Sequence, residues 1–347
     1  MTPNSVTPGQ DGAMAKTPIQ PRRWYPPKDV GLRGPFAPNT ALGSPEVIPL
    51  PGTGAEDVAV DTAGNIYTGT REGYILRISA DGRHVERLVQ TGGRPLGIEV
   101  HPDGYLVICD AHRGLLRLDP TTLELDVIAS DVHGIPMKIT NNCAIASDGS
   151  IYFSDSSQEF SLDEFKGDII AHTSSGRLLR WNTNGTVEVL LDGLNFANGV
   201  ALAADESFVL VAETSGYCVT RLDLTGPSAG RRSLIIENLP GLPDNMSTGS
   251  DGVFWIAMPS VRNKLLDFLL PKPGFLRSAI WAMPDKLQPD ASRITWVVGI
   301  DGEGTVVRNL QGPGTAYHYV TGVREHADRL YLGSLVEPGI AVVDLPR

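Results

Sequence analysis

The segment EDVAVDTAGNIYTGT (56–70) decides the fold of this chain, because its pattern recurs along the sequence. Four further copies are LGIEVHPDGYLVICD (96–110), NNCAIASDGSIYFSD (141–155), NGVALAADESFVLVA (198–212) and DNMSTGSDGVFWIAM (244–258). Each copy predicts a short alternating strand, a polar turn and a second strand rich in β-branched and aromatic residues. A sixth, less regular copy is VTGVREHADRLYLGS (320–334). The chain therefore repeats one small β unit.

Two more strands follow most copies, such as GYILRIS (73–79) and VERLVQ (85–90) after the first. Four strands recurring in this way predict an all-β fold, a six-bladed β-propeller with four-stranded antiparallel blades. The last copy ends after its third strand, GIAVVDL (339–345), whereas a spare apolar segment, PEVIPLP (45–51), precedes the first. We expect this N-terminal strand to complete the last blade and close the ring. Several separate small β-domains are the alternative, but a single blade has too little core to stand alone.

The predicted domain organisation is a Pro/Gly-rich N-terminal tail over 1–44 and a single propeller domain over 45–347. Two insertions interrupt the repeat, at about 158–175 and at 259–284. In the second, a short amphipathic helix ended by Pro271 is predicted by the apolar residues Val261, Leu265, Leu266, Phe268 and Leu269. Such a helix forms a lid over one face, packs on a blade edge or binds a second copy in a homodimer, and the sequence leaves these alternatives open.

Composition excludes some classes of partner. The net charge is −11 with a pI near 5.1, and no run of Lys and Arg is present, so nucleic acid and anionic membrane surfaces are not expected partners. No window of about 18 apolar residues predicts a transmembrane segment, and the first residues lack the apolar stretch of a signal peptide. We therefore expect a cytoplasmic protein. Three cysteines lie far apart in apolar runs and are expected to be reduced core residues: Cys109, Cys143 and Cys218.

One position of the repeat carries oxygen-bearing side chains in four of five copies. Counting back from the turn of each copy gives Glu56, Leu96, Asn141, Asn198 and Asp244. In a ring of equivalent blades this position lies at the start of the innermost strand, at one height on the axis. The side chains therefore converge, although each one alone is an ordinary turn or strand-start residue.

Two carboxylates and two carboxamides near an axis are costly to bury without a partner. A divalent cation solves this, and a donor set made only of oxygen favours Ca²⁺ over zinc or copper, with Mg²⁺ and then Mn²⁺ as the next choices. Four protein ligands leave positions open for water and a small-molecule substrate, as in a catalytic site. The predicted metal ligands are Glu56, Asn141, Asn198 and Asp244.

The second strand of each blade returns to the face where the first strand began. Its last residues therefore line the rim, and Asp110 lies at such a position. The predicted substrate-binding residues are Arg71, His112, Asp155, Ser156, Glu213, Met258 and Arg262.

The motifs GAEDVAVD (54–61), FANGVAL (196–202) and LPGLPDNM (239–246) resemble those of the senescence marker protein, gluconolactonase and luciferin-regenerating enzyme family. YTGTREGYILRI (67–78), CDAHRGLLRLDP (109–120) and REHADRLYLGSL (324–335) are similar to its strictosidine synthase-like branch. The resemblance implies a calcium-dependent hydrolase of lactones or related esters, with the four ligand positions holding the catalytic ion. It departs at Asn142, where the family often has Asp, and near Leu335, where the related fluorophosphatase has a histidine; phosphotriesterase activity is therefore not expected.

We expect a mechanism in which calcium polarises the substrate carbonyl and Glu56 anchors the ion. Asp244 is expected to be both ligand and general base, with a role as nucleophile as the alternative. Two other functions stay open. One is metal-free condensation as in strictosidine synthase, which uses a last-blade glutamate; Glu325 lies in that neighbourhood. The other is a non-enzymatic calcium-binding scaffold that binds a partner through 259–284.

Overall fold

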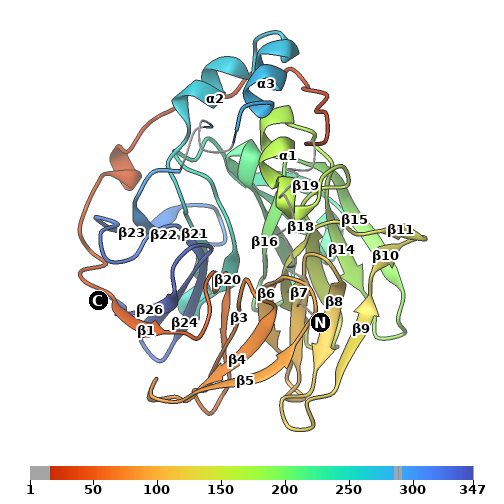
Figure 1. Ribbon diagram of the computed structural model, residues 1–347, viewed down its shortest axis with the longest axis vertical. Helices are drawn as coiled ribbons and strands as arrows, with labels where there is room; N and C mark the ends of the chain where they lie inside the picture. The colour runs from red at the N-terminus through yellow and green to blue at the C-terminus, as the bar shows by residue number, and fades with distance from the viewer. Residues whose placement is uncertain (1–15, 285–287, 289–290, 347) are drawn as a thin grey trace, which may run out of the picture.

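The computed structural model describes residues 16–284, 288 and 291–346. Within this part of the chain, six four-stranded antiparallel sheets form a six-bladed β-propeller, with a cap of short helices at one end (Figure 1). This confirms the predicted fold class.

The blades are numbered from the N-terminus, and each starts with its innermost strand. Blade 1 contains β2 (Val58–Val60), β3 (Ile66–Gly69), β4 (Tyr74–Ile78) and β5 (Val85–Gln90). Blade 2 contains β6 (Pro95–Val100), β7 (Leu106–Asp110), β8 (Gly114–Leu118) and β9 (Leu125–Ala129). Blade 3 contains β12 (Thr140–Ile145), β13 (Ile151–Asp155), β14 (Gly176–Trp181) and β15 (Val187–Leu194). A small hairpin of β10 (Asp131–Val132) and β11 (Ile135–Pro136) precedes blade 3.

The remaining blades follow the same order. Blade 4 contains β16 (Ala197–Leu202), β17 (Phe208–Glu213), β18 (Cys218–Asp223) and β19 (Arg232–Ile236). Blade 5 contains β20 (Met246–Thr248), β21 (Phe254–Ala257), β22 (Thr295–Ile300) and β23 (Val306–Gly312). Blade 6 contains β24 (Val320–His326), β25 (Arg329–Ser334), β26 (Gly339–Asp344) and β1 (Glu46–Pro49).

The N-terminal strand closes the ring, as predicted. Strand β1 pairs antiparallel with β26, with Glu46 opposite Val342 and Pro49 opposite Gly339. Apolar clusters fill the interfaces between neighbouring blades, and one of them joins Ile48 and Val58 to Tyr331 across the closure. The propeller is therefore held by contacts between blades, because one blade alone cannot bury both faces of its sheet.

Burial falls from the axis outward. In blade 3 every residue of β13 is buried, whereas the outer strand β15 is exposed or partly buried except at its last residue, Leu194. Because of this gradient, the central strands such as β13 are rich in apolar residues, whereas the outer strands contain more charged and polar ones. The three cysteines are free and buried, as expected.

Both insertions form helices at the same end of the propeller (Figure 1). The first contains α1 (Phe165–Ala171), and the second contains α2 (Lys264–Leu269) and α3 (Gly274–Trp281). Helix α2 confirms the predicted amphipathic helix, and the Asn263 side chain caps it by accepting hydrogen bonds from the Leu265 and Leu266 amides. Short 3₁₀ turns are η1 (Gly34–Phe36), η2 (Leu162–Glu164), η3 (Thr214–Gly216), η4 (Gly226–Ser228) and η5 (Ser250–Gly252).

The N-terminal segment lies along the helical cap and then along blades 5 and 6. Trp24 stacks on His172 with ring centroids 4.3 Å apart, Phe36 is buried between blades 4 and 5, and Leu42 is buried between blades 5 and 6. Tyr25 is exposed. The division of the chain at residue 44 stays a prediction. Among the described residues, none of the helices has the length and apolar character needed to cross a membrane.

Candidate functional site

The predicted ring residues lie where the innermost strands begin. Leu96, Asn141 and Asn198 are each the second residue of β6, β12 and β16, whereas Glu56 and Asp244 lie two residues before β2 and β20. In β6, β12 and β16 the pairing with the next strand is interrupted by a bulge at this point. A bulge adds one residue and redirects a side chain. The bulges therefore change the direction of the side chains of Leu96, Asn141 and Asn198, which no longer follow the regular alternation between the two faces of the sheet.

Blade 6 contributes a sixth ring position that the sequence analysis did not assign. Thr321 is the second residue of β24, and a bulge follows it in the pairing with β25. Its hydroxyl donates to the Glu56 carbonyl oxygen at 2.8 Å, and its own carbonyl accepts from the Asn245 amide at 3.0 Å. Thr321 therefore links blades 5 and 1 through the ring.

The two ring asparagines are buried, and each donates its amide nitrogen to a hydroxyl. Asn141 Nδ2 donates to Ser156 Oγ at 2.9 Å, and Asn198 Nδ2 donates to Thr214 Oγ1 at 3.1 Å. The Thr214 hydroxyl donates to the Pro243 carbonyl at 2.8 Å, so it acts as the acceptor for Asn198. Both Oδ1 atoms lack a hydrogen-bond partner among the described residues. The Oδ1 atoms of Asn141 and Asn198 can therefore donate lone pairs to a ligand such as a cation.

The two ring carboxylates are buried as well. Burial first, and the nearby Asp244 charge second, raise the pKa of Glu56 well above its ordinary value. Burial raises the pKa of Asp244 to about 7, although a hydrogen bond from the Asn198 side chain opposes this rise. Two acids that repel each other while two amide oxygens stay unpaired form a donor set that a cation would stabilise.

The residues present fit a hard divalent cation. Glu56 Oε2 accepts from Asn245 Nδ2 at 2.8 Å, which fixes one of its oxygens. The buried Arg94 guanidinium lowers the pKa of Glu56, and its own donors are directed to the Gly54 and Pro95 carbonyls. In the part of the chain that the structure describes, no group of three His, Cys, Asp or Glu side chains is arranged to hold a metal. The candidate set has only two such residues and relies on amide oxygens for the rest.

The residue after each ring position alternates between a polar side chain and glycine around the axis. Asp57, Asn142 and Asn245 alternate with Gly97, Gly199 and Gly322. Asn142 Nδ2 donates to Asp57 Oδ2 at 3.0 Å, and its Oδ1 accepts from the Val200 amide at 2.8 Å. A Cβ atom at Gly97 would lie 2.5 Å from the Asn141 carbonyl. The glycines thus make room for this polar layer, and Asn142 belongs to it.

The acidic residues that end the second strands brace their own blades. The backbone amides of Arg94, Ile139 and Asn195, which precede the first strands, donate to Asp110, Asp155 and Glu213 respectively. Asp155 also pairs with the buried Arg177 at 2.6 Å.

Glu213 also receives hydrogen bonds from Asn195 Nδ2 and Thr220 Oγ1, and it pairs with Arg232. The carboxylates of Asp155 and Glu213 are therefore engaged within their blades.

The other predicted wall residues lie in different surroundings. Ser156 contacts Asn141, His112 is exposed, and Met258 is fully buried in the cluster between blades 4 and 5. The Arg71 guanidinium donates to the Leu335 carbonyl. Arg262 is buried and pairs with Asp267 of α2 at 3.0 Å. Of the seven, Ser156 is the one hydrogen-bonded to a ring side chain among the described residues.

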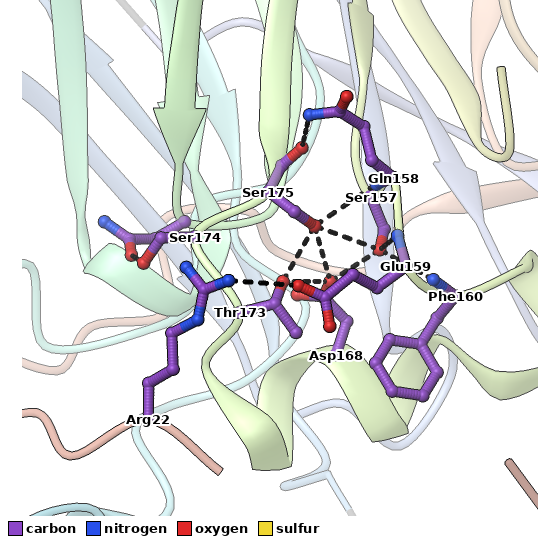
Figure 2. A network of polar contacts seen from close by, with 10 residues as sticks. Arg22, Ser157, Gln158, Glu159, Phe160, Asp168, Thr173, Ser174 and Ser175 are labelled. Atoms are coloured by element: carbon purple, nitrogen blue, oxygen red, sulfur yellow. Dashed lines mark hydrogen bonds and ion pairs between the residues drawn. The ribbon is translucent and has the colours of Figure 1, made fainter. Parts of the chain in front are cut away.

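Helix α1 is fixed to blade 3 by one buried carboxylate (Figure 2). Asp168 Oδ2 accepts from Ser157 Oγ at 2.6 Å, Thr173 Oγ1 at 2.5 Å and Ser175 Oγ at 3.4 Å. Ser157 and Ser175 lie near the two ends of the first insertion, so Asp168 closes its base. Burial raises the pKa of Asp168 to about 6, and the three hydroxyls oppose that rise.

A cavity of about 710 Å³ lies between the helical cap and the ring end of the pore. Phe165 and Ile169 of α1 line it and also pack around the ring residue Leu96. Leu242, two residues before Asp244, and Tyr319, two residues before Thr321, line it as well. Arg71 and Arg262 are the two predicted wall residues among its described lining. The volume is typical of a site for a small organic molecule.

Comparison with known proteins assigns the family. The sequence profile described as strictosidine synthase matches residues 141–226, and the one described as strictosidine synthase-like, N-terminal, matches residues 34–78. The chain is 32% identical over 357 residues to the adipocyte plasma membrane-associated protein of Danio rerio, covering 96% of this chain and 85% of that protein. It is also 34% identical over 298 residues to the protein strictosidine synthase-like 6 of Arabidopsis thaliana, covering 84% of this chain and 78% of that protein. This chain belongs to the strictosidine synthase-like family. The predicted resemblance is confirmed.

Solved structures share the fold of this strictosidine synthase-like chain. A gluconolactonase from Xanthomonas campestris has a TM-score of 0.64 and 18% identity, covering 95% of this chain and 98% of that one. The calcium-binding protein regucalcin from Agrobacterium tumefaciens has a TM-score of 0.62 and 14% identity, covering 87% and 93%. At these low sequence identities, the structural similarity shows that the propeller fold is shared and shows nothing about function.

Thr214, which accepts from the Asn198 amide nitrogen, was not predicted from the sequence as a site residue. Thr214 follows Glu213 as Ser156 follows Asp155, so an acid followed by a hydroxyl marks the blades that carry a ring asparagine. In blade 2 the corresponding pair is Asp110 and Ala111, and there the ring residue is the apolar Leu96. This correlation between two distant positions was available in the sequence.

Proposed function

We propose that the protein is a calcium-dependent hydrolase of lactones or related esters, with Glu56, Asn141, Asn198 and Asp244 holding the ion. The observation that carries the proposal is the pair of buried Oδ1 atoms, on Asn141 and Asn198, that lack a partner among the described residues beside two buried carboxylates. Ca²⁺ suits such oxygen donors best, and Mg²⁺ and Mn²⁺ are weaker candidates. The gluconolactonase and the calcium-binding regucalcin that share the fold support this choice.

Calcium bound in such a set supplies a Lewis acid that polarises the substrate carbonyl. Asp244 is the proposed catalytic base, and its carboxylate accepts a proton from the water that attacks the carbonyl carbon. Ser156 and Thr214 hold the amide nitrogens of Asn141 and Asn198 and so keep both Oδ1 atoms toward the pore. Both amides are neutral, so as ligands they would not reduce the positive charge of a bound ion.

The cavity under the helical cap is the proposed substrate chamber. Arg71 and Arg262 line it, and Arg71 is the better candidate for substrate contact, because Arg262 is paired with Asp267. Ser156 acts on Asn141, and Asp155 and Glu213 brace their blades, so we propose supporting roles for these three. Contact of His112 and Met258 with substrate stays a prediction.

A panel of lactones and aryl esters, assayed with chelator and again after calcium is restored, tests the reaction class. Asp244→Asn should lower turnover by roughly 10²–10⁴-fold at saturating calcium. Asp301→Asn, in an outer turn of blade 5, is the matched control and should keep full activity. Unchanged turnover in Asp244→Asn would exclude the proposed base.

Metal-free condensation is the second candidate, and the match to the strictosidine synthase profile favours it. It predicts turnover of an amine with an aldehyde that chelator does not affect. Glu325, however, lies near the hairpin end of β24 and accepts from Trp255 Nε1 at 2.6 Å, at the end of that strand opposite to Thr321. Its position does not favour a role beside the cavity. A calcium-binding scaffold predicts full metal occupancy without hydrolysis across the panel.

A homodimer through residues 259–284 and a cytoplasmic location stay predictions. Phe268 and Phe275 in that insertion are exposed, which supports the surface as a candidate contact between two copies. Sedimentation of the purified chain at several concentrations would test the dimer.

A further inference from the structure

The described lining of the cavity under the helical cap combines apolar side chains with cations. Phe165 and Ile169 of α1, Leu266 and Leu269 of α2 and Ile280 of α3 form much of its wall. The cations are Arg71, Lys166, Arg262, Lys264 and Arg277. Among the lining residues that the structure describes, there is no Asp or Glu. This sign of charge is unexpected in a chain with a net charge of −11.

Arg277 of α3 is the residue that most strongly indicates an anion-binding cavity. Its side chain is 1% exposed, and it donates to the carbonyls of Ile170 and Ala171 at the end of α1 and of Arg22 in the N-terminal segment. Its Nε has no hydrogen-bond partner among the described residues, and its described side-chain hydrogen bonds go to carbonyl oxygens and to no carboxylate. Burial lowers its pKa. A buried cation without a counter-ion is costly, and an anion in the cavity would offset that cost.

Lys166 and Lys264 add to the positive charge at this site. Lys264 is exposed and Lys166 is half-buried, and neither side-chain ammonium group makes a hydrogen bond or ion pair with a described residue. Arg262 differs, because Asp267 neutralises it at 3.0 Å. The lining cations without an ion pair to a described residue are thus Arg71, which donates to the Leu335 carbonyl, and those of α1, α2 and α3. Each of these three helices also supplies apolar wall.

We propose that this cavity binds an amphiphile with a hydrocarbon chain and a carboxylate, the chain against the apolar wall and the carboxylate toward the cations. That such an amphiphile is also the substrate or product of the protein rests on the proposed hydrolase function. Water adds its hydroxyl to the acyl carbon of an alkyl lactone, the acyl carbon–oxygen bond breaks, and the ring oxygen takes a proton. The product is a hydroxy acid, which ionises to a carboxylate on an alkyl chain, so the cavity suits alkyl-substituted lactones and esters.

Binding of three ligands with the same chain to the full-length protein tests the proposal. The ligands are decanoate, decanol and decyltrimethylammonium, measured by titration calorimetry in the presence of chelator so that calcium plays no part. We expect decanoate to bind at least roughly 10-fold more tightly than the decyltrimethylammonium cation, because like charges inside a cavity repel. Butyrate, which keeps the carboxylate and shortens the chain, should bind more weakly than decanoate.

Substitutions of the lining cations test whether decanoate binds in the cavity. Lys166→Gln combined with Lys264→Gln should weaken decanoate binding and leave decanol binding unchanged, and the Arg pair at the same positions should restore it. Lys28→Gln, which is exposed and not among the described lining residues, is the control. Because Arg277→Gln can impair folding, its decanoate titration is interpreted only alongside its thermal unfolding.

Equal binding of decanoate and decyltrimethylammonium, or no binding of either, would overturn the proposal. Neither result would bear on the hydrolase, which the chelator-sensitive lactone assay tests separately. Conversely, selective decanoate binding in a protein without hydrolase activity would leave the cavity assignment intact and remove its connection to catalysis.

Discussion

Replacing Asp168 by asparagine should change how the stability of the protein depends on pH. The carboxyl group of this α1 residue is fully buried against blade 3 (Figure 2), and its pKa is raised from the ordinary value of 3.8 to about 6. Burial is the main cause, and the hydroxyls of Ser157, Thr173 and Ser175 oppose it. Because the folded pKa is the higher one, the folded state holds a proton that the unfolded state has lost. The resulting stability is present below about pH 4 and is lost as the pH rises through about 6.

The pKa difference between 3.8 and about 6 corresponds to about 3 kcal/mol of unfolding free energy. The amide that replaces the carboxyl group cannot titrate, so the stability of the parent relative to Asp168→Asn should fall by about this amount between roughly pH 4 and pH 7. Urea unfolding of both proteins across this range measures the difference, and groups that titrate in both proteins cancel.

A pH-independent difference between the two proteins would refute the assigned burial cost. A parent that gains relative stability as the pH rises would mean that the three hydroxyl donors outweigh burial and lower the pKa. Ser157→Ala separates the two effects, because it removes the 2.6 Å hydrogen bond and should raise the pKa further.

Three other substitutions test the site and its support. Thr214→Val removes the acceptor of the Asn198 amide nitrogen, so calcium affinity measured by titration calorimetry should fall by roughly 10-fold or more. Arg177→Met leaves the Asp155 carboxylate buried without its 2.6 Å partner, and urea unfolding should show a loss of about 3–5 kcal/mol. Gly199→Ala places a Cβ atom about 2.3 Å from a backbone nitrogen of the next blade, and should cost at least about 1–3 kcal/mol in the same assay.

Matched variants make these predictions falsifiable. Thr248→Val also removes a hydroxyl that donates to a carbonyl, but away from the ring, and should leave calcium affinity unchanged. Gly302→Ala meets nothing closer than 3.8 Å and should be nearly neutral in stability. Calcium affinity of Thr214→Val equal to that of the parent, or a Gly199→Ala variant as stable as Gly302→Ala, would contradict the geometry.

Repetition explains why the fold could be predicted from the sequence. Each copy carries the same strand, turn and strand pattern, and the missing strand of the last blade matched the spare segment that became β1. Helix α2 was predicted because its apolar spacing and Pro271 are local signals. Helices α1 and α3 were not predicted. Arg277 fixes α3 through a contact with Ile170, 107 positions away in the sequence. Asp168 fixes α1 through hydroxyls 5 to 11 residues away, a contact that apolar spacing does not reveal.

The candidate metal ligands were predicted from their equivalent positions in the repeat alone, because equivalent positions of a closed ring of blades lie at the same height along its axis. Register cannot tell which side chains at a strand end face substrate. Asp155 and Glu213 accept hydrogen bonds from the backbone amides of Ile139 and Asn195, which precede the first strands of their blades. Buried backbone amides need such acceptors, so these carboxylates are engaged within the blades. The bulges that redirect Asn141 and Asn198 have no single-residue signal, since they depend on pairing with the next strand.

Titration of chelator-treated protein with calcium chloride tests most directly whether the ring oxygens share one ion. We predict a single calcium site per chain, and a Glu56→Gln variant that folds but binds calcium more than roughly 10-fold more weakly. No binding at millimolar calcium, or equal affinity in the parent and in Glu56→Gln, would contradict it.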